Sequence, residues 1–475
     1  MTISMRWLAM CFLVSLPSLG CVTVGMGLHQ QYFKRETHDA GVKPEHLHGP
    51  AILEGVADPN SRDARFSKDC SVAMALSGGG TISASFTYGV VRELAALSPM
   101  GSASHLRNPL WQVDYFSTAS GGGITAALVE VLMREVEREK SADWDEALTR
   151  KLDGAINLET FSENYFSKSQ LLFKAGTGVL QLYHDRLPVG IFGEGHACGA
   201  KEPVLTVGEA FPSKPSVFPI WVPNATAFWD GRRVPLTPQV LKTLAQGGKL
   251  RPEGTTFPCA GMLGDKVENW LVTDLIAASM SFPGIGPYRL VSERDGQADL
   301  VFDLVDGGIA DNLGTGSAFD MLSLTSSPRK LLIVVDASAD AERGVYTRRR
   351  PLTVEDYLGE LANIFLAAQY PEAKRRAEEL ARAKGIDLVW IRLQDIPDDT
   401  ELSGCPGLGS EKSPWSEAGQ SRCEQRYNHR AADFINNLKM SVSIPADEAN
   451  GLMQLGRLAA RRSALAEKLQ RCLSP

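Results

Sequence analysis

The chain has 475 residues, and 44% of them are hydrophobic, which is enough to bury a sizeable core and excludes a disordered protein. Its 49 Lys and Arg residues against 56 Asp and Glu residues give a formal charge of −7. This mild acidity offers no general attraction to phosphate backbones, so we expect no nucleic acid partner.

The first predicted element is an uncharged segment, residues 7–28, that follows Arg6. Its most apolar part has the length of a signal-peptide core, and small, helix-breaking residues come after it. Cys21 directly follows Gly20, an arrangement that resembles a bacterial lipoprotein signal and implies lipidation of the cysteine. We therefore expect a signal peptide over residues 1–20 and a location in the cell envelope, at the outer membrane or facing the periplasm. A single uncleaved membrane anchor, which needs about 20 apolar residues, and ordinary secretion are the alternatives.

Residues 21–68 are polar and interrupted by Gly and Pro, which is typical of a tether or an extended arm. Four histidines are scattered through this segment without the spacing of a metal site, so we expect no metal there. Beyond it, six cysteines remain, an even number that suits an oxidising compartment. Cys405 and Cys423 flank a loop rich in Gly, Pro and Ser, and a local disulfide between them is a hypothesis.

The ordered domain is predicted over residues 69–440, followed by a C-terminal helical segment, residues 441–475. Two short apolar strands each run into a cluster of glycines and then into a helix. Strands alternating with helices in this way predict an α/β fold with a layered sheet. Irregular structure is expected at residues 235–270, which contain Gly and Pro. Further strands are predicted within residues 218–229, 300–308 and 330–338, the last a continuous apolar run typical of a strand covered on both faces.

The two glycine clusters read SGGGTISAS and TASGGGITA. Neither contains the Gly-Lys-Ser/Thr with which a P-loop neutralises phosphate charge. A Gly-x-Gly-x-x-Gly pattern with an acidic ribose ligand is also missing. We therefore expect no nucleotide partner.

The second cluster fits a nucleophile at a sharp turn between a strand and a helix. Ser120 lies between Ala119 and Gly121, which are small enough to let the turn close and to admit a substrate. The following helix places its positive N-terminal end at the serine, which lowers the energy of a developing alkoxide by about 1 kcal/mol.

A serine hydroxyl reacts only when a base accepts its proton. Asp306 follows an apolar strand and precedes two glycines in the segment LVDGGIADNLG, so its carboxylate could be presented at the edge of a sheet. The same three residues also suit an ordinary turn. A histidine base, His184 or His196, is the other alternative, although neither lies in a recognisable catalytic loop.

Taken together, these segments resemble the patatin-like phospholipase family over about residues 70–340. Two further segments, VPNATAFWDGRRV and IAASMSFPGIGPYRL, add to the likeness. The resemblance implies a three-layer α/β/α fold with a mostly parallel central sheet, and a Ser-Asp dyad. It assigns the dyad to Ser120 and Asp306, the oxyanion donors to the backbone N–H groups of Gly78, Gly79 and Gly80, and supporting motif positions to Gly122, Gly307 and Gly308.

The chain departs from the family pattern at two positions. Thr118 stands where the family's Gly-x-Ser-x-Gly has its first glycine, and Ile82 stands where the family has Arg or Lys after the oxyanion glycines. The expected function is hydrolysis of a lipid acyl ester, of phospholipase A or lysophospholipase type, at a membrane surface and without metal or cofactor. A non-catalytic, membrane-attached binding protein of the same fold is the first alternative, and an esterase with a Ser-His-Asp triad is the second.

Overall fold

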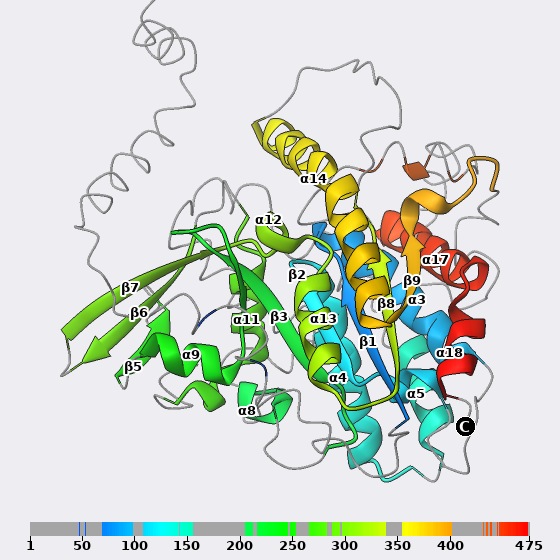
Figure 1. Cartoon of the computed structure of the whole chain (residues 1–475), viewed down its shortest axis with the longest axis horizontal. Helices are drawn as coiled ribbons and strands as arrows, with labels where there is room; N and C mark the ends of the chain where they lie inside the picture. Colours follow the sequence, from blue (N-terminus) through cyan, green and yellow to red (C-terminus); the bar gives the residue numbers. More distant parts are fainter. Residues whose placement is uncertain are drawn as a thin grey trace, which may run out of the picture.

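One mixed sheet of nine strands lies at the centre of the described part of the protein (Figure 1). The computed structural model describes residues 47, 53, 69–97, 108–141, 143–154, 205–211, 216–245, 248–252, 266–282, 287–294, 297–338, 354–400, 431, 434–435, 438, 444 and 446–473. The strands are arranged in the order β5-β6-β7-β3-β2-β1-β8-β9, and β4 pairs with β3.

The central strands of this sheet run parallel to one another. They are β3 (Ile220–Ala227), β2 (Tyr115–Ala119), β1 (Cys70–Leu76), β8 (Arg329–Asp336) and β9 (Asp387–Arg392). Strand β1 is buried along its whole length and β8 from Leu331 onward, because helices cover both faces of the sheet. The α/β fold and the mostly parallel central sheet predicted from the sequence are thus confirmed. The carboxyl ends of these strands lie along one edge of the sheet, where ligands of open α/β sheets bind.

An antiparallel extension continues the sheet beyond β3. It consists of β7 (Gln297–Val305), β6 (Tyr288–Arg294) and β5 (Lys249–Pro252), while β4 (Arg233–Pro235) also pairs with β3. The prediction of irregular structure at residues 235–270 is wrong in part, because helix α9 (Pro238–Ala245) and β5 form there. A four-residue edge strand is too short to show an alternating pattern in the sequence.

Helices cover the two faces of the sheet (Figure 1). Helices α3 and α4 each begin just after a glycine turn that follows a strand. They pack against each other and against α5, and α4 also contacts α11. On the opposite face α13 contacts β1, β2 and β8, and α14 contacts α13 and β9. The bounds are α3 Gly80–Ala96, α4 Gly122–Arg138, α5 Trp144–Gly154, α8 Val207–Ala210, α11 Val272–Ser279, α12 Gly308–Asp311, α13 Thr315–Leu324 and α14 Val354–Lys384, with short 3₁₀ turns at Pro109–Gln112, Val267–Asn269 and Leu393–Asp395.

The C-terminal segment forms two helices, α17 (Ala446–Arg462) and α18 (Leu465–Leu473). Helix α17 crosses α3 so closely that a Cβ atom added to Gly89 would lie 2.0 Å from the carbonyl oxygen of Met453. Helix α18 contacts β1, β8 and β9. The C-terminal helices therefore pack directly against α3 and β1, the two elements on either side of the first glycine turn.

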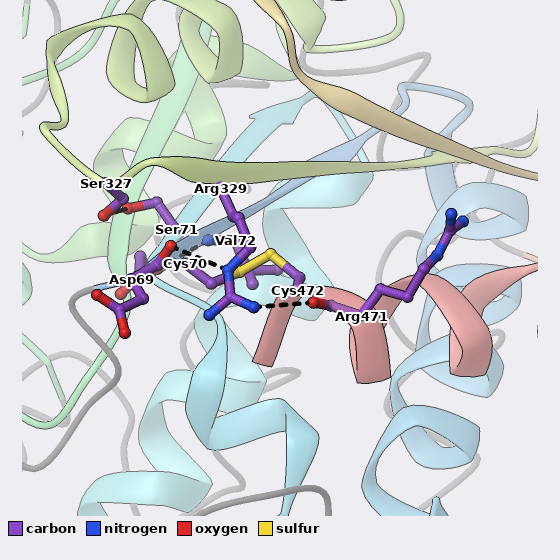
Figure 2. Close-up of a disulfide and its surroundings, with 9 residues drawn as sticks. Asp69, Cys70, Ser71, Val72, Ser327, Arg329, Arg471 and Cys472 are labelled. Atoms are coloured by element: carbon purple, nitrogen blue, oxygen red, sulfur yellow. Dashed lines mark hydrogen bonds between the residues drawn. A yellow bond between two sulfur atoms is a disulfide. The ribbon is translucent and has the colours of Figure 1, made fainter. Parts of the chain in front are cut away.

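A disulfide joins Cys70, the first residue of β1, to Cys472 in α18, across a sequence separation of 402 residues (Figure 2). Both cysteines are buried, and beside them a guanidinium nitrogen of Arg329 donates a hydrogen bond to the carbonyl oxygen of Arg471 at 3.2 Å. The structure thus pairs two of the six cysteines counted in the sequence. The hypothetical pair Cys405 and Cys423 lies outside the described residues.

The predicted signal peptide and Cys21 also lie outside the described residues. Within the predicted tether, Leu47 and Leu53 are described, and both side chains are buried in the hydrophobic core. At these two positions the segment contributes to the core, which an extended arm in solvent would not do. No helix of the described ranges combines the length and the apolar character that crossing a bilayer requires.

Candidate active site

Ser120 occupies the turn between β2 and α4. Its backbone has φ of 46°, in the left-handed region that non-glycine residues rarely adopt. The turn is tight, because a Cβ atom added to Gly121 would lie 2.0 Å from the carbonyl oxygen of Gly80, and one added to Gly122 would lie 2.6 Å from that of Leu76. The small residues therefore allow the two glycine clusters of the sequence to lie against each other.

The structure brings Ser120 and Asp306 together, although 186 residues separate them. The Ser120 hydroxyl donates a hydrogen bond to Asp306 Oδ2 at 2.7 Å. Asp306 directly follows β7, and its other oxygen, Oδ1, accepts the N–H of Gly308 at 2.7 Å. Gly307 is required at its position because an added Cβ atom would lie 2.1 Å from the carbonyl oxygen of Asn224. The sequence Asp-Gly-Gly thus presents one carboxylate oxygen to the serine and fixes the other.

Burial controls the charge of Asp306. Its side chain is removed from solvent, and this desolvation raises the pKa of the carboxyl from 3.8 to about 6, while hydrogen bonds from Ser120 and Gly308 partly oppose the rise. In the described part of the chain no basic side chain pairs with it. The carboxylate is therefore ionised at neutral pH and is a stronger base than an ordinary aspartate. The alternative bases His184 and His196 lie outside the described residues.

The glycine loop before α3 departs from the prediction at one position. The N–H of Gly78 donates to the carbonyl oxygen of Asn312 at 2.8 Å, so it is not available to a substrate. Gly79 and Gly80 have φ values of 135° and 58°, which favour glycine. Among the described residues, no acceptor binds the N–H groups of these two. The free donors of this loop are therefore Gly79 and Gly80, at the positive end of α3.

The N–H of Ser120 itself is also occupied. It donates to the hydroxyl of Ser279 at 2.8 Å, which removes it from the set of groups that could face a substrate. No motif in the sequence indicates this contact, because 159 residues separate the two serines. Asn312 is a second residue of the site that no motif indicates. It lies six residues after Asp306, and its Oδ1 would be 2.4 Å from a Cβ atom added to Gly78.

The two departures from the family pattern have different surroundings. The Thr118 hydroxyl is buried in β2 and accepts a hydrogen bond from the indole N–H of Trp221 at 2.9 Å. The threonine is thus satisfied within the sheet and lies outside the turn at Ser120. Ile82 lies in the first turn of α3 and is 8% exposed, so this position supplies an apolar side chain where the family has a cation.

Comparison with known proteins identifies the family. The family model for patatin-like phospholipase matches residues 74–319, more than half of the chain, and the chain therefore belongs to this family. Membership supports hydrolysis of lipid acyl esters in general. No curated protein matches the chain in sequence.

The solved structures with similarity to the chain include human GIVD cytosolic phospholipase A2. That structure is 13% identical, with a TM-score of 0.45 over 89% of this chain and 63% of that one. The same human protein in complex with methyl gamma-linolenyl fluorophosphonate gives a TM-score of 0.40 at 13% identity, over 90% of this chain and 62% of that one. VipD from Legionella pneumophila gives 0.26 at 13% identity, over 82% and 67%. The chain thus spans less than two thirds of the length of the human protein.

Proposed function

We propose that the protein hydrolyses the carboxylic ester of an acyl lipid, as a phospholipase A or lysophospholipase, through a dyad of Ser120 and Asp306. The observation that carries the proposal is the 2.7 Å hydrogen bond from the Ser120 hydroxyl to a buried carboxylate whose pKa is raised to about 6. A base of this strength, in direct contact with the nucleophile, can accept its proton at neutral pH.

The reaction begins when Ser120 Oγ attacks the ester carbonyl carbon and its proton moves to Asp306 Oδ2. The N–H groups of Gly79 and Gly80 stabilise the oxyanion, and one such donor is typically worth about 3 kcal/mol. Collapse of the tetrahedral intermediate breaks the ester C–O bond, and Asp306 gives its proton to the departing alcohol. Asp306 then accepts a proton from water, which attacks the acyl-enzyme, and the fatty acid leaves as Ser120 regains its proton. These steps use only side chains and backbone groups of this chain.

The turn between β3 and β4 offers a surface for the lipid. Phe228 and Trp229, in the turn between β3 and β4, are 57% and 46% exposed, and they are two of only four exposed large hydrophobic residues in the described ranges. The Phe228 N–H donates to the Asp303 carbonyl oxygen, and the Trp229 ring packs edge-on against Phe302 of β7. The residues of β7 that the pair contacts lie three and four positions before Asp306, which is about 10 to 13 Å along the strand. Exposed Trp and Phe partition into the interfacial layer of a bilayer, so we propose this turn as the contact with a phospholipid surface.

A fluorophosphonate probe and an assay panel test the proposed activity. The purified protein should be labelled at Ser120, and it should release fatty acid from phospholipids or lysophospholipids and cleave short-chain esters. Ser120→Ala should abolish both labelling and turnover. Full activity in Ser120→Ala would refute the assignment of the nucleophile.

A second candidate function is a membrane-attached binding protein that retains the fold without useful turnover. The observation that favours it is Ile82, because the apolar side chain withholds the positive charge that the family places beside the oxyanion loop. Absence of hydrolysis throughout the panel, together with a folded protein that binds phospholipid vesicles, would support this candidate over the first.

We also propose that the protein is an envelope lipoprotein with a signal peptide over residues 1–20, lipidation at Cys21 and an extension to residue 68 before the hydrolase domain of residues 69–440. The buried disulfide between Cys70 and Cys472 supports an oxidising compartment, since such bonds persist there and are rare in the cytosol. Expression with a radiolabelled fatty acid tests this. Label should enter the wild type and not Cys21→Ala, and unlabelled wild type would contradict the proposal.

A further inference from the structure

Residues 279–281, the last residue of α11 and the two that follow it, contact the backbone of both dyad residues. The hydroxyl of Ser279 accepts the N–H of Ser120 at 2.8 Å. The carbonyl oxygen of Ser281 accepts the N–H of Asp306 at 2.9 Å, and that of Ser279 accepts the N–H of Gly307 at 3.0 Å. One short segment, from neither motif, therefore fixes the nucleophile and the base relative to each other.

The Ser279 hydroxyl is oriented by a second hydrogen bond, in which it donates to the carbonyl oxygen of Asn224 at 2.6 Å. Because its only hydrogen is used there, an oxygen lone pair is directed at the Ser120 N–H. Asn224 also holds the end of β2 directly, since its side-chain amide donates to the Thr118 carbonyl oxygen at 2.9 Å. Ser279 is fully buried, so no bulk water can replace its hydroxyl.

Ser120 needs such an anchor because its backbone lies in the left-handed region, which is strained for a non-glycine residue. A conformation of this kind persists only where the surroundings over-determine it. Without the Ser279 oxygen, the N–H of Ser120 would be buried and unsatisfied, and the turn would relax toward other acceptors. The Ser120 hydroxyl would then lose its alignment with Asp306 Oδ2.

We propose that Ser279 is a positioning residue for the reaction: its hydroxyl holds the Ser120 backbone so that Oγ faces Asp306, and it keeps the Ser120 N–H out of the oxyanion site. The inference rests on the proposed function of the dyad. Ser279 touches neither substrate nor the reacting atoms, and it acts through the backbone of the nucleophile.

The test compares Ser279→Ala with Ser279→Thr and with a matched control, Ser292→Ala. Ser292 lies in β6, and its buried hydroxyl donates to the Ala245 carbonyl oxygen at 2.9 Å, without contact to the dyad. The control therefore removes a buried serine hydroxyl that binds a backbone carbonyl, as Ser279→Ala does, but away from Ser120 and Asp306. The readouts are kcat and KM on a soluble ester, the rate constant of fluorophosphonate labelling, and Tm.

We expect Ser279→Ala to lower kcat and the labelling rate constant about 10- to 100-fold, the rate equivalent of leaving one buried donor without its acceptor, with KM changed less than about twofold. Ser279→Thr, which restores a hydroxyl, should recover most of the loss. Ser292→Ala should keep kcat within about threefold of wild type, even where its Tm falls as far as that of Ser279→Ala.

Equal kcat in the two alanine variants, or a loss confined to KM, would overturn the inference. If Ser279→Ala does not fold, Ser279→Cys takes its place, because the thiol has nearly the same shape but is a weak acceptor. Wild-type kcat in the folded Cys variant would then overturn the inference too. A wild-type protein that neither turns over ester nor reacts with the probe would instead refute the proposed function, so the two failures are distinguishable.

Discussion

Two aspartates lie at the ends of strands in the same sheet, separated by β3, β2 and β1, and their environments differ in one respect. Asp306 follows β7 and Asp336 ends β8, and both carboxyls are buried, which raises the pKa of each. Asp336 lies 3.4 Å from the guanidinium Nε of Arg392, which opposes that rise. Asp306 is bound only by the hydroxyl of Ser120 and the N–H of Gly308 among the described groups.

The difference separates a structural carboxylate from a reactive one. The charge of Asp336 is matched by the guanidinium of Arg392, and its Oδ1 accepts the backbone N–H of Ser338 at 2.8 Å. The charge of Asp306 has neutral donors only, and desolvation raises the pKa of its carboxyl to about 6. An aspartate at a strand end therefore becomes a base where burial is not compensated by a cation.

The largest expected effect is on activity. Asp306→Asn should lower kcat on a soluble ester by about 10³-fold or more, because the amide cannot accept the serine proton. Asp336→Asn should leave the kcat of the folded protein within about tenfold of wild type, since this side chain contacts neither dyad residue. Steady-state kinetics on both variants checks this. A loss in Asp336→Asn as great as that in Asp306→Asn would remove the distinction between the two carboxylates.

The second effect is on the stability of Asp306→Asn. The pKa of Asp306 is about 6 in the folded protein against an ordinary value of 3.8, so folding is penalised as pH rises through this window, by about 3 kcal/mol once it is complete. Asp306→Asn should therefore raise the free energy of unfolding at pH 8 and change it little below pH 4.

Urea unfolding at pH 8 and at pH 4 measures both differences. The comparison needs only the change between variant and wild type at each pH, so the absolute stability does not enter. Destabilisation of Asp306→Asn at pH 8 would contradict the assignment of an uncompensated buried charge to this position.

The third effect is the pH dependence of the reaction. The dyad needs Asp306 ionised, so kcat/KM should be level above about pH 6 and fall about tenfold for each pH unit below it. An unperturbed aspartate would keep kcat/KM level down to about pH 4. A soluble ester assayed from pH 4.5 to 8, with Ser120→Ala as the blank, distinguishes the two profiles.

The smallest effect extends the comparison to the surface. Phe228 and Trp229 lie beside β7, the strand of Asp306, whereas the exposed Ile364 lies on α14, which packs against β9, the strand of Arg392. Replacing Phe228 and Trp229 together by Ala should lower hydrolysis of phosphatidylcholine vesicles about 3- to 10-fold and leave soluble ester hydrolysis unchanged. Ile364→Ala is the matched control, and an equal effect in it would argue against a specific lipid-binding turn.

The sequence predicted the parts of the site that short motifs record. Ser120 and Asp306 each stand beside glycines, and the structure shows why, since Cβ atoms at Gly121 and Gly307 would collide with carbonyl oxygens. The occupied N–H of Gly78 could not be predicted in this way. Its acceptor is a backbone carbonyl from a distant loop, and a backbone contact leaves no trace in residue type.

The anchor at Ser279 escaped prediction for a related reason. The segment IAASMSFPG resembles family sequence, but the resemblance assigns no role to its serines. A serine at a helix end has many local hydrogen-bond partners, and only the folded chain shows which distant group it binds. In the fold, the long apolar strand β8 was predicted from its composition. The short edge strand β5 was missed, because its pairing with β6 comes from tertiary context.

The bond between Cys70 and Cys472 makes a covalent ring of almost everything that the structure describes. If a protease cuts the chain once between these two residues, the two fragments stay joined by the disulfide and separate only after reduction. Strand β1, with its glycine turn, and helix α18 would therefore remain covalently linked in the cut protein. The first 69 residues lie outside the ring, and this segment meets the core through the buried side chains of Leu47 and Leu53, ahead of the disulfide in the sequence.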